Sequence, residues 1–481
     1  MTMRWKVINY YIGVFLRIFS VLMLVPVAVG KFYGESFVLL EPFLIASFTA
    51  IVLGSVLART GSKVRPEPLE AMATATLAWL LAVGLGAIPL HSMTGISFLD
   101  AYFEAMSGMT TTGMSMLLTL DLPKSLLFWR VFMQWIGGLG ILTFFVTVLV
   151  ESGGVARKLV ATEANKTSGG SVRASLFTSI KTLWYVYVVL TVLEILALHH
   201  FGMTGFQSVV NSLSTLPTGG FASTSNLSAL MNPGIKATMI LFMFLGGTNF
   251  LLIYSVMKGN LMRMFKDFEF RLYSLFLISG FGLVAADLVV NSGATIASAF
   301  ETSAFHSTSV LTSTGFVLEP LRNFPGISKF VFLVMMFVGG SLGSTTGGIK
   351  MLRLGIVLKV VRQQIRSLGI PRTVLNPVSV GGRILGDDEI RQVVSIVALW
   401  MLAILAGGLV TVAFSKYGIV ESAQVMVSAM GTMGPTFIPQ AELVSLHPLV
   451  KVSLMVGMLA GRLEMLPILS LLNVRLLKKI A

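Results

Sequence analysis

The chain alternates between long apolar stretches and short polar segments that contain glycine. Two apolar stretches, at about residues 10–29 and 36–58, are separated by a short turn and predict a hairpin of two helices. From Glu70 onward a different unit recurs four times. Each unit has a long apolar stretch, a half-length amphipathic segment, a glycine-bearing loop and a second apolar stretch. A repeat of this kind determines the architecture, so the rest of the chain is interpreted against it.

The half-length segments predict helices that enter the membrane without crossing it. The long first helices of the four units are expected at about 71–90, 182–198, 271–290 and 390–414. The segments that follow, such as 98–109 and 297–309, are about 12 residues long. At 1.5 Å per residue, such a helix reaches about halfway through a hydrocarbon core of ~30 Å. Backbone at that depth must line a cavity or be buried in protein.

Each half-length segment leads into a hydroxyl-rich loop that ends at a glycine. The four loops are Ser107–Ser115, Ser214–Phe221, Leu311–Phe316 and Met430–Phe437. Four such loops around one axis would form a ring of backbone carbonyls, which suits a dehydrated monovalent cation. Glycine permits the positive φ that turns these carbonyls inward. We therefore predict a selectivity filter at Gly113, Gly219, Gly315 and Gly434, the alternative being four tight turns that cap hairpins.

The second apolar stretches share a feature that supports the fourfold interpretation. Small residues recur at similar distances after each loop, at Gly137-Gly138, Gly246-Gly247, Gly339-Gly340 and Ala460-Gly461. One such pair in a membrane helix usually indicates only close helix packing. Four pairs in matching positions indicate four copies of one structural unit.

The composition places the chain in a membrane, because 55% of the residues are hydrophobic and only 12% are charged. We expect an all-α polytopic membrane protein with ten spans. It would have an N-terminal two-helix hairpin (1–66) and four pseudo-symmetric helix, pore-loop and helix repeats around one pore (67–166, 167–262, 263–380 and 381–481). The net charge of +14 does not indicate nucleic-acid binding, since the basic residues lie between apolar spans.

The distribution of these basic residues predicts the orientation. Of the 35 Lys and Arg residues, 25 lie on the side of the N-terminus, whereas the segment His199–Pro233, which contains the second loop, has no charged residue. By the positive-inside rule, the glycine loops open outward from the cell membrane and both termini are cytoplasmic.

Several polar residues leave alternatives open. The acids Asp100, Glu104, Glu301 and Glu421, in the half-length segments, are either helix caps or cation attractors. The five histidines lie near the outer ends of spans and are expected to be interfacial. Glu194 and Asp287 lie in first spans and would be the second ion site of a Na⁺- or H⁺-coupled secondary transporter. No set of nucleophile, base and orienting group is present, so we predict no enzyme.

The third repeat contains a second glycine-rich segment. Residues 326–368 have a helical pattern, yet the segment 339–349 places five glycines among eleven residues and cannot be a stable helix interior. Gly348-Ile349-Lys350 lacks the Gly-Lys-Ser/Thr of a phosphate-binding loop, so this chain itself is predicted to bind no nucleotide. An uncharged loop below the filter is a candidate gate, and a passive break in a long helix is the alternative. The gate residues would be Gly339, Gly340, Ser341, Gly343, Ser344, Thr345, Thr346, Gly347, Gly348 and Lys350.

Arg462 follows the last of the paired small residues, level with Ser341 of the third repeat. A guanidinium inside the membrane should face the bundle interior and find acceptors there. The freed carbonyls of the segment 339–349 would supply them, so we predict that Arg462 holds that segment across the pore. The alternative is a purely structural role, with Glu464 or Glu151 as partner.

The four loops and the extra hairpin resemble the superfamily of potassium transporters that includes TrkH, KtrB and the plant HKT proteins, and TrkH most of all. The resemblance implies that K⁺ is the transported ion and that the segment 339–349 is the gate. It implies K⁺ coordination by carbonyls near the filter glycines, at Thr111, Thr112, Pro217, Thr218, Ser313, Thr314, Thr432 and Met433. Pro217 and Met433 depart from the hydroxyl residues expected there.

The same resemblance implies partners. It predicts a homodimer in the lipid bilayer and a cytoplasmic ring of TrkA-like nucleotide-binding regulatory subunits. The basic segment Lys350–Arg391 is either the docking surface for these subunits or only a signal for membrane orientation.

Overall fold

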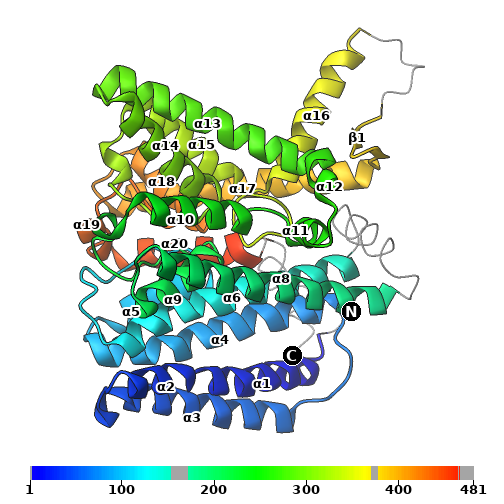
Figure 1. The fold of residues 1–481 in the computed structure, drawn as a ribbon. Coiled ribbons are helices and arrows are strands. Elements are labelled where there is room, and N and C mark those ends of the chain that lie inside the picture. Colours follow the sequence, from blue (N-terminus) through cyan, green and yellow to red (C-terminus); the bar gives the residue numbers. More distant parts are fainter. Residues whose placement is uncertain (1–2, 153–171, 370–376, 464, 466–481) are drawn as a thin grey trace.

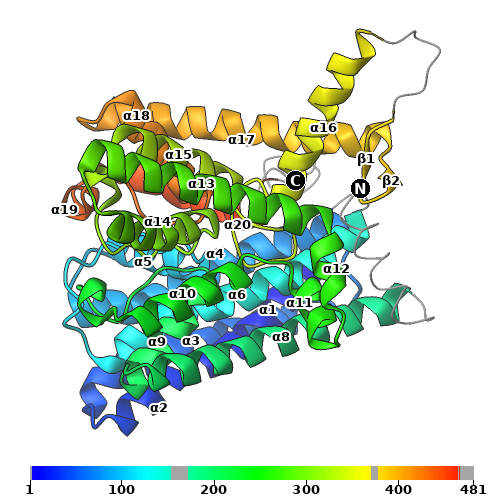
Figure 2. The same ribbon diagram turned by 45° about the horizontal axis from the view of Figure 1, so that its top comes forward.

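The structure, a computed structural model, describes residues 3–152, 172–369, 377–463 and 465. Its long helices run along one common direction, side by side, and α16 projects away from the bundle in both views (Figures 1 and 2). The predicted boundary at residue 166 and the C-terminal basic residues lie outside the described residues. The described chain is helical except for one two-stranded sheet and the connecting loops.

The predicted N-terminal hairpin is confirmed. It consists of α1 (Trp5–Leu22), α2 (Val25–Phe32) and α3 (Phe37–Thr60). Glycines let α1 and α3 approach closely, because a β-carbon at Gly13 would lie 2.6 Å from the carbonyl oxygen of Gly54. Arg4 joins the hairpin to the first repeat through an ion pair with Glu70, with 2.8 Å between Nη2 and Oε2.

Four repeats follow the hairpin, as the sequence predicts. The long first helices are α4 (Pro68–Thr94), α8 (Val172–His200), α13 (Phe268–Ser292) and α17 (Asp387–Phe414). The half-length pore helices are α5 (Phe98–Met109), α9 (Gly205–Thr215), α14 (Ile296–Leu311) and α18 (Ile419–Met430). The second helices are α6 (Lys124–Ser152), α10 (Pro233–Gly246), α15 (Gly326–Val338) and α20 (Pro448–Leu463).

Local sequence explains where three of the pore helices begin. Ser97, Thr204 and Thr295 occupy their N-cap positions, and each side-chain oxygen accepts a hydrogen bond from the backbone N–H three residues later. Such caps satisfy N–H groups that have no partner in the first turn. Because Gly95 and Gly293 end the preceding helices α4 and α13 in the left-handed conformation, the chain turns back toward the bundle.

The second helices are less regular than the sequence predicts. Helix α10 ends at Gly246, and the chain bends by 111° into α11 (Phe250–Met257). The Asn249 side chain stabilises this break, since it accepts a hydrogen bond from Leu251 N at 2.9 Å. By length and composition, six of the described helices could cross a membrane, or seven if α10 and α11 form one bent span.

Shorter elements lie at the two ends of the bundle. Helices α12 (Leu261–Lys266) and α16 (Met351–Ser367) and the antiparallel strands β1 (Ser379–Val380) and β2 (Arg383–Ile384) lie at one end. Helix α19 (Gln440–Val444) lies at the other end, and η1 (Leu227–Leu230) and η2 (Leu321–Asn323) are single 3₁₀ turns in the loops that follow the second and third pore helices.

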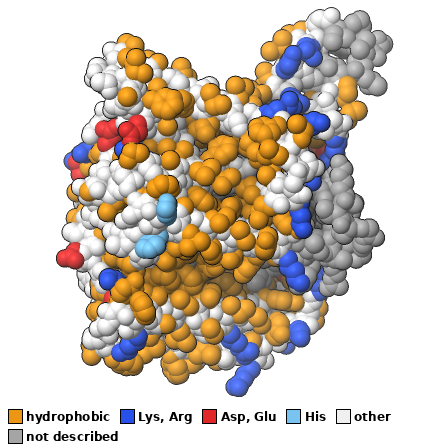
Figure 3. Space-filling view, viewed as in Figure 1, with side chains coloured by type: hydrophobic (Ala, Val, Ile, Leu, Met, Phe, Trp, Pro, Cys, Tyr) orange, Lys and Arg blue, Asp and Glu red, His pale blue; other side chains and the backbone are white. Residues whose placement is uncertain are grey.

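The surface of the bundle separates charge from apolar area. Figure 3 shows a broad hydrophobic surface across the middle of the molecule. Most of the Lys and Arg side chains visible there gather at the end where α16 lies, and the visible Asp and Glu side chains lie mainly at the opposite end. This is the distribution expected of a multi-pass membrane protein.

Candidate functional site

The four glycine loops adopt one shared backbone conformation. A hydroxyl residue in each loop has a positive φ, with Thr111 at 55°, Thr218 at 57°, Ser313 at 55° and Thr432 at 48°. Two residues later a glycine also has a positive φ, with Gly113 at 81°, Gly220 at 79°, Gly315 at 80° and Gly434 at 97°. Non-glycine residues adopt this region at a cost and cluster where function requires a strained backbone.

The structure corrects the alignment of the second loop by one residue. Gly220 has the positive φ and Gly219 does not, so the prediction of a positive φ at Gly219 is wrong. A hydrogen bond common to all loops explains the shift, because one serine of each pore helix accepts the N–H of the residue before the glycine. The four bonds are Thr112 N to Ser107 O, Gly219 N to Ser214 O, Thr314 N to Ser309 O and Met433 N to Ser428 O, at 2.8–3.0 Å. Pro217 consequently lies before the positive-φ turn.

The loops form a closed ring, because each glycine packs against the next loop. A β-carbon at Gly113 would lie 2.2 Å from Gly219 O, and one at Gly220 would lie 2.3 Å from Thr314 O. A β-carbon at Gly315 would lie 1.8 Å from Met433 O, and one at Gly434 would lie 2.5 Å from Thr112 O. The four contacts run from loop one to two, three, four and back to one. Only glycine permits so close an approach.

The ring contains polar atoms that have no protein partner. The hydroxyls of Thr111, Ser313 and Thr432 are buried and have no hydrogen-bond partner among the described residues. The fourth hydroxyl, that of Thr218, donates to Pro217 O at 2.6 Å. Because buried polar groups normally find partners, three free hydroxyls at equivalent positions fit a site for a cationic ligand.

Above the ring, the residues that follow the four glycines line one cavity of about 560 Å³. Its lining includes Ser115, Phe221, Phe316 and Pro435, one from each loop. The lining also includes Gln440 and Leu443 of α19, so the cavity lies between the ring and the end of the bundle where α19 lies.

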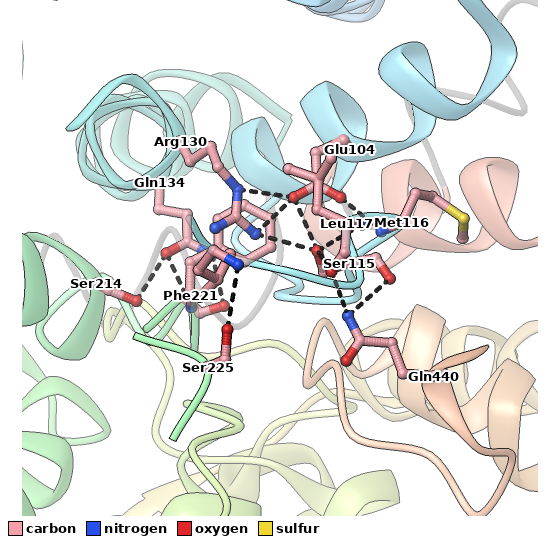
Figure 4. A network of polar contacts seen from close by, with 12 residues as sticks. Glu104, Ser115, Met116, Leu117, Arg130, Gln134, Ser214, Phe221, Ser225 and Gln440 are labelled. Atoms are coloured by element: carbon pink, nitrogen blue, oxygen red, sulfur yellow. Dashed lines mark hydrogen bonds and ion pairs between the residues drawn. The ribbon is translucent and has the colours of Figure 1, made fainter. Parts of the chain in front are cut away.

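A buried ion pair supports the first loop. Arg130 of α6 binds Glu104 of α5, with 2.8 Å from Nε and 2.6 Å from Nη2 to Oε1 (Figure 4). Glu104 also accepts hydrogen bonds from Met116 N and Ser115 Oγ, and the guanidinium lies 4.1 Å from the centre of the Phe221 ring. Glu104 is therefore neither a helix cap nor a free cation attractor, because its charge is already paired.

The other three acids of the half-length segments also have a partner or a favourable position. Asp100 forms an ion pair with Lys451 of α20, and Glu301 forms one with Lys236 of α10. Glu421 lies in the first turn of α18, where a negative charge is favourable.

Gln134 is a residue that sequence reasoning missed. Its Nε2 donates to Gly219 O at 2.6 Å, and its Oε1 accepts from Ser214 Oγ at 2.8 Å (Figure 4). It thus holds a carbonyl of the ring from the neighbouring repeat. A polar residue inside an apolar span was the available signal, but the sequence does not identify its partner.

The paired small residues of the second helices have a structural explanation. A β-carbon at Gly137, Gly246 or Gly461 would lie 2.1, 2.9 or 1.8 Å from the carbonyl oxygen of Met109, Leu216 or Met430, respectively. Each of these carbonyls belongs to the end of the pore helix of the same repeat. In these three repeats the pair therefore lets the second helix pack directly against the base of its loop.

The predicted interruption of the third repeat is confirmed. Helix α15 ends at Val338 and α16 begins at Met351, and the intramembrane loop (residues 339–349) lies between them. The whole loop is buried apart from Gly343, which is half-buried. Lys350, at the end of the loop, has φ of 79°, and its ammonium group donates to Thr346 O.

The intramembrane loop contacts the bases of two of the glycine loops. The hydroxyl of Thr345 shares its one hydrogen between Leu216 O at 2.9 Å and Gly246 O at 3.1 Å. On the other side, a β-carbon at Gly347 would lie 2.2 Å from Gly431 O. The loop therefore lies against the second and fourth repeats, next to the residues that precede the ring.

Arg462 reaches the intramembrane loop, as predicted. Its Nη1 donates to Thr345 O at 2.5 Å, and its Nη2 donates to Gly137 O at 3.0 Å. The side chain is 2% exposed. Glu464 lies outside the described residues, and nothing of the Glu151 side chain is described.

Glu269 is a second contact that the sequence did not predict. It lies in the first turn of α13, and its Oε1 accepts from Leu342 N at 2.6 Å and from Leu352 N at 3.1 Å. One oxygen atom therefore holds both the intramembrane loop and the first turn of α16.

Glu194, Asp287 and His306 lie in different environments. Glu194 is buried beside Thr215. Asp287 accepts hydrogen bonds from Ser328 and Asn291. His306 is fully buried inside α14, so its interfacial prediction is wrong. His91, by contrast, is exposed at the end of α4.

The fold and the site define a polytopic helical membrane protein whose four pore-loop repeats meet in one ring. The chain belongs to the TrkH family of cation transport proteins, whose family model matches residues 40–477. An uncharacterized cation transporter of Methanocaldococcus jannaschii is 31% identical over 98% of this chain and 97% of its own. The potassium uptake protein TrkH of Escherichia coli is 29% identical over 98% of both chains. The crystal structure of the potassium transporter TrkH from Vibrio parahaemolyticus matches with a TM-score of 0.87 and 26% identity, covering 98% of this chain and 100% of that chain.

Proposed function

We propose that this chain takes up K⁺ through a channel-like path, down the electrochemical gradient of the ion. The observation that carries the proposal is the closed ring in which four positive-φ glycines pack on carbonyls of neighbouring loops. Such a ring presents oxygen atoms with partial charge, which can replace the water of a monovalent cation. Relatives that are named potassium uptake proteins support K⁺ as the substrate.

The filter would consist of the backbone around the four glycines. On this proposal, Gly113, Gly220, Gly315 and Gly434 mark its outer edge, and the carbonyls of Thr112, Gly219, Thr314 and Met433 belong to it. The side chain of Met433 does not weaken this assignment, because the backbone oxygen is the ligand. The unpartnered hydroxyls of Thr111, Ser313 and Thr432 would complete the inner site.

The intramembrane loop would be the gate. Its burial, its contacts with two filter loops and its hydrogen bond to Arg462 support a closed arrangement below the ring. The guanidinium would hold the loop in place and would also oppose the passage of cations. A passive break would need neither a buried charge nor contacts with the filter loops.

The same proposal includes the orientation and the partners. The basic end of the bundle would be cytoplasmic, together with both termini. A homodimer would expose the segment Lys350–Arg391 to a ring of TrkA-like nucleotide-binding subunits. Helix α16 projects from the bundle within this segment, and the strands β1 and β2 lie at the same end, which suits a docking surface.

Ion flux into proteoliposomes tests the proposal. Purified protein should conduct K⁺ in preference to Na⁺ with no Na⁺ or pH gradient present, and the direction of flux should follow the K⁺ gradient. Flux that requires a Na⁺ or H⁺ gradient would instead support coupled transport.

Coupled transport remains the second candidate because of Glu194. This carboxyl group is buried beside Thr215, at the base of the second loop. Asp287 offers no such site, because Ser328 and Asn291 already occupy its oxygens. If transport is coupled through Glu194, the Glu194→Gln variant should lose the dependence on the Na⁺ or H⁺ gradient.

A further inference from the structure

Each pore helix carries one polar side chain that accepts a hydrogen bond from the backbone just beyond the filter. In every loop the donor is the N–H of the third residue after the positive-φ glycine. The four bonds join Met116 N to Glu104 Oε2 at 2.7 Å, Ser223 N to Asn211 Oδ1 at 3.3 Å, Leu318 N to His306 Nε2 at 3.2 Å and Phe437 N to Gln424 Oε1 at 2.9 Å. We name these four side chains the anchor residues.

The anchor residues share only the ability to accept a hydrogen bond. One is a carboxylate, two are amides and one is an imidazole, and all four are fully buried. In the first three repeats the acceptor and the donor are twelve residues apart. In the fourth repeat they are thirteen apart. A common geometry built from unlike side chains indicates that the acceptor itself is what the loops require.

Other contacts fix the orientation of each anchor residue. Arg130 holds Glu104, and the amide nitrogen of Asn211 donates to Ser223 Oγ at 3.0 Å. The amide nitrogen of Gln424 donates to Pro435 O at 3.2 Å. An anchor residue in such surroundings cannot easily turn away from its N–H.

The contacts of His306 also determine its protonation state. Its Nδ1 lies 2.8 Å from Thr302 O, which can only accept, so Nδ1 carries the proton. Its Nε2 must then be the unprotonated acceptor for Leu318 N. The ring is therefore neutral, and it performs the same task as an amide oxygen.

We infer that Glu104, Asn211, His306 and Gln424 are positioning residues of the selectivity filter. Each holds the backbone segment that leaves the filter, at the third residue after the glycine. It thereby limits how far the preceding carbonyls can turn. This inference rests on the proposed function, because it assumes that the ring selects K⁺.

His306 provides the sharpest test, because one substitution keeps the acceptor and another removes it. In proteoliposomes, the ratio of K⁺ to Na⁺ flux should fall about tenfold in His306→Leu, because the loop backbone at Leu318 loses its buried hydrogen bond and can move. It should stay close to wild type in His306→Gln, whose amide oxygen replaces Nε2. The matched control is His91→Leu, which removes an exposed histidine of α4 and should leave the ratio unchanged.

The outcomes separate this inference from the proposed function. Wild-type protein with no preference for K⁺ would overturn the proposed function. A selective wild type together with an equally selective His306→Leu variant would overturn the anchor role alone.

A second pair of variants covers the case in which His306→Leu does not fold. Asn211→Leu removes the acceptor of the second loop, and Asn211→Asp keeps it, so only the first should lose selectivity. If both leucine variants misfold while the acceptor variants fold, these residues serve folding rather than the filter, and the inference is wrong.

Discussion

Arg462 donates from Nη1 to the carbonyl oxygen of Thr345 at 2.5 Å, so the last described helix contacts the intramembrane loop directly. The same guanidinium donates to Gly137 O of the first repeat. One side chain thus connects the fourth, third and first repeats next to the ring of glycines. Removing it should loosen the loop, because the loop loses its hydrogen bond to the fourth repeat.

Arg462→Ala should raise basal K⁺ flux. Hydrogen bonds to charged groups stabilise by about 1.5–3 kcal/mol. The loss of one from the loop should therefore increase the open population by roughly tenfold to a hundredfold. Flux per reconstituted protein measures this effect, and size-exclusion chromatography checks that the protein is folded. Folded protein with wild-type flux would contradict the latch.

Gly113→Ala should abolish K⁺ selectivity, because its β-carbon would lie 2.2 Å from Gly219 O. Gly95→Ala is the matched control. Gly95 has a similar φ of 72°, but a β-carbon there would meet nothing within 4 Å. Both variants carry backbone strain of about 1–3 kcal/mol, so a difference between them isolates the contact across the ring. Equal selectivity in the two variants would exclude this role for Gly113.

Deleting Ser344–Gly347 from the intramembrane loop should increase basal K⁺ flux. The deletion removes Thr345 and Gly347, which contact the second and fourth repeats below the ring. Comparison of flux at equal reconstituted protein is the appropriate measurement. Unchanged flux would favour a passive break in the helix.

Glu104→Ala should destabilise the protein by about 3–5 kcal/mol, because it leaves the buried Arg130 guanidinium without its partner. Lys416→Ala provides the control, since it breaks an ion pair with Glu442 in which the Lys416 side chain is 73% exposed. Exposed pairs contribute at most about 1 kcal/mol. Thermal unfolding in detergent should rank the two variants clearly, and similar unfolding temperatures would contradict the role of the buried pair.

Glu269→Ala should weaken the hold on the intramembrane loop and raise basal flux. Glu269→Gln should behave like the wild type, because one oxygen accepts both backbone N–H groups and an amide oxygen can replace it. The measurement is K⁺ flux with the two variants side by side. If the glutamine variant is as leaky as the alanine variant, the charge of Glu269 matters rather than its acceptor.

The repeat pattern was sufficient to predict the helices, the pore loops and the interruption after Val338, because each follows from local hydropathy and glycine content. The alignment of the second loop was not predicted correctly, since Gly219 and Gly220 are adjacent and either could take a positive φ. A signal for the correct choice was present. The positive-φ glycine follows a serine by the same spacing in all four loops, from Ser107 to Gly113 and from Ser214 to Gly220.

Contacts between segments that lie far apart in the chain could not be predicted from one sequence. The bond of Gln134 to the second loop and the bonds of Glu269 to the intramembrane loop and to α16 depend on which elements become neighbours, and nothing in their local sequence encodes a partner. The sharp bend after Gly246 was missed for a related reason. Its break is stabilised by Asn249 and by contacts with the intramembrane loop, such as Ser341 N to Gly247 O at 2.9 Å.

The intramembrane loop comes from one repeat alone, although four repeats surround the path. A pore made of four identical chains can widen symmetrically, because each chain moves in the same way. Here one segment would swing aside while the other three quarters of the wall stay still. On the gating role proposed above, the open path would therefore be off-centre, displaced toward the third repeat, and a blocking ion would meet different walls in the open and closed states.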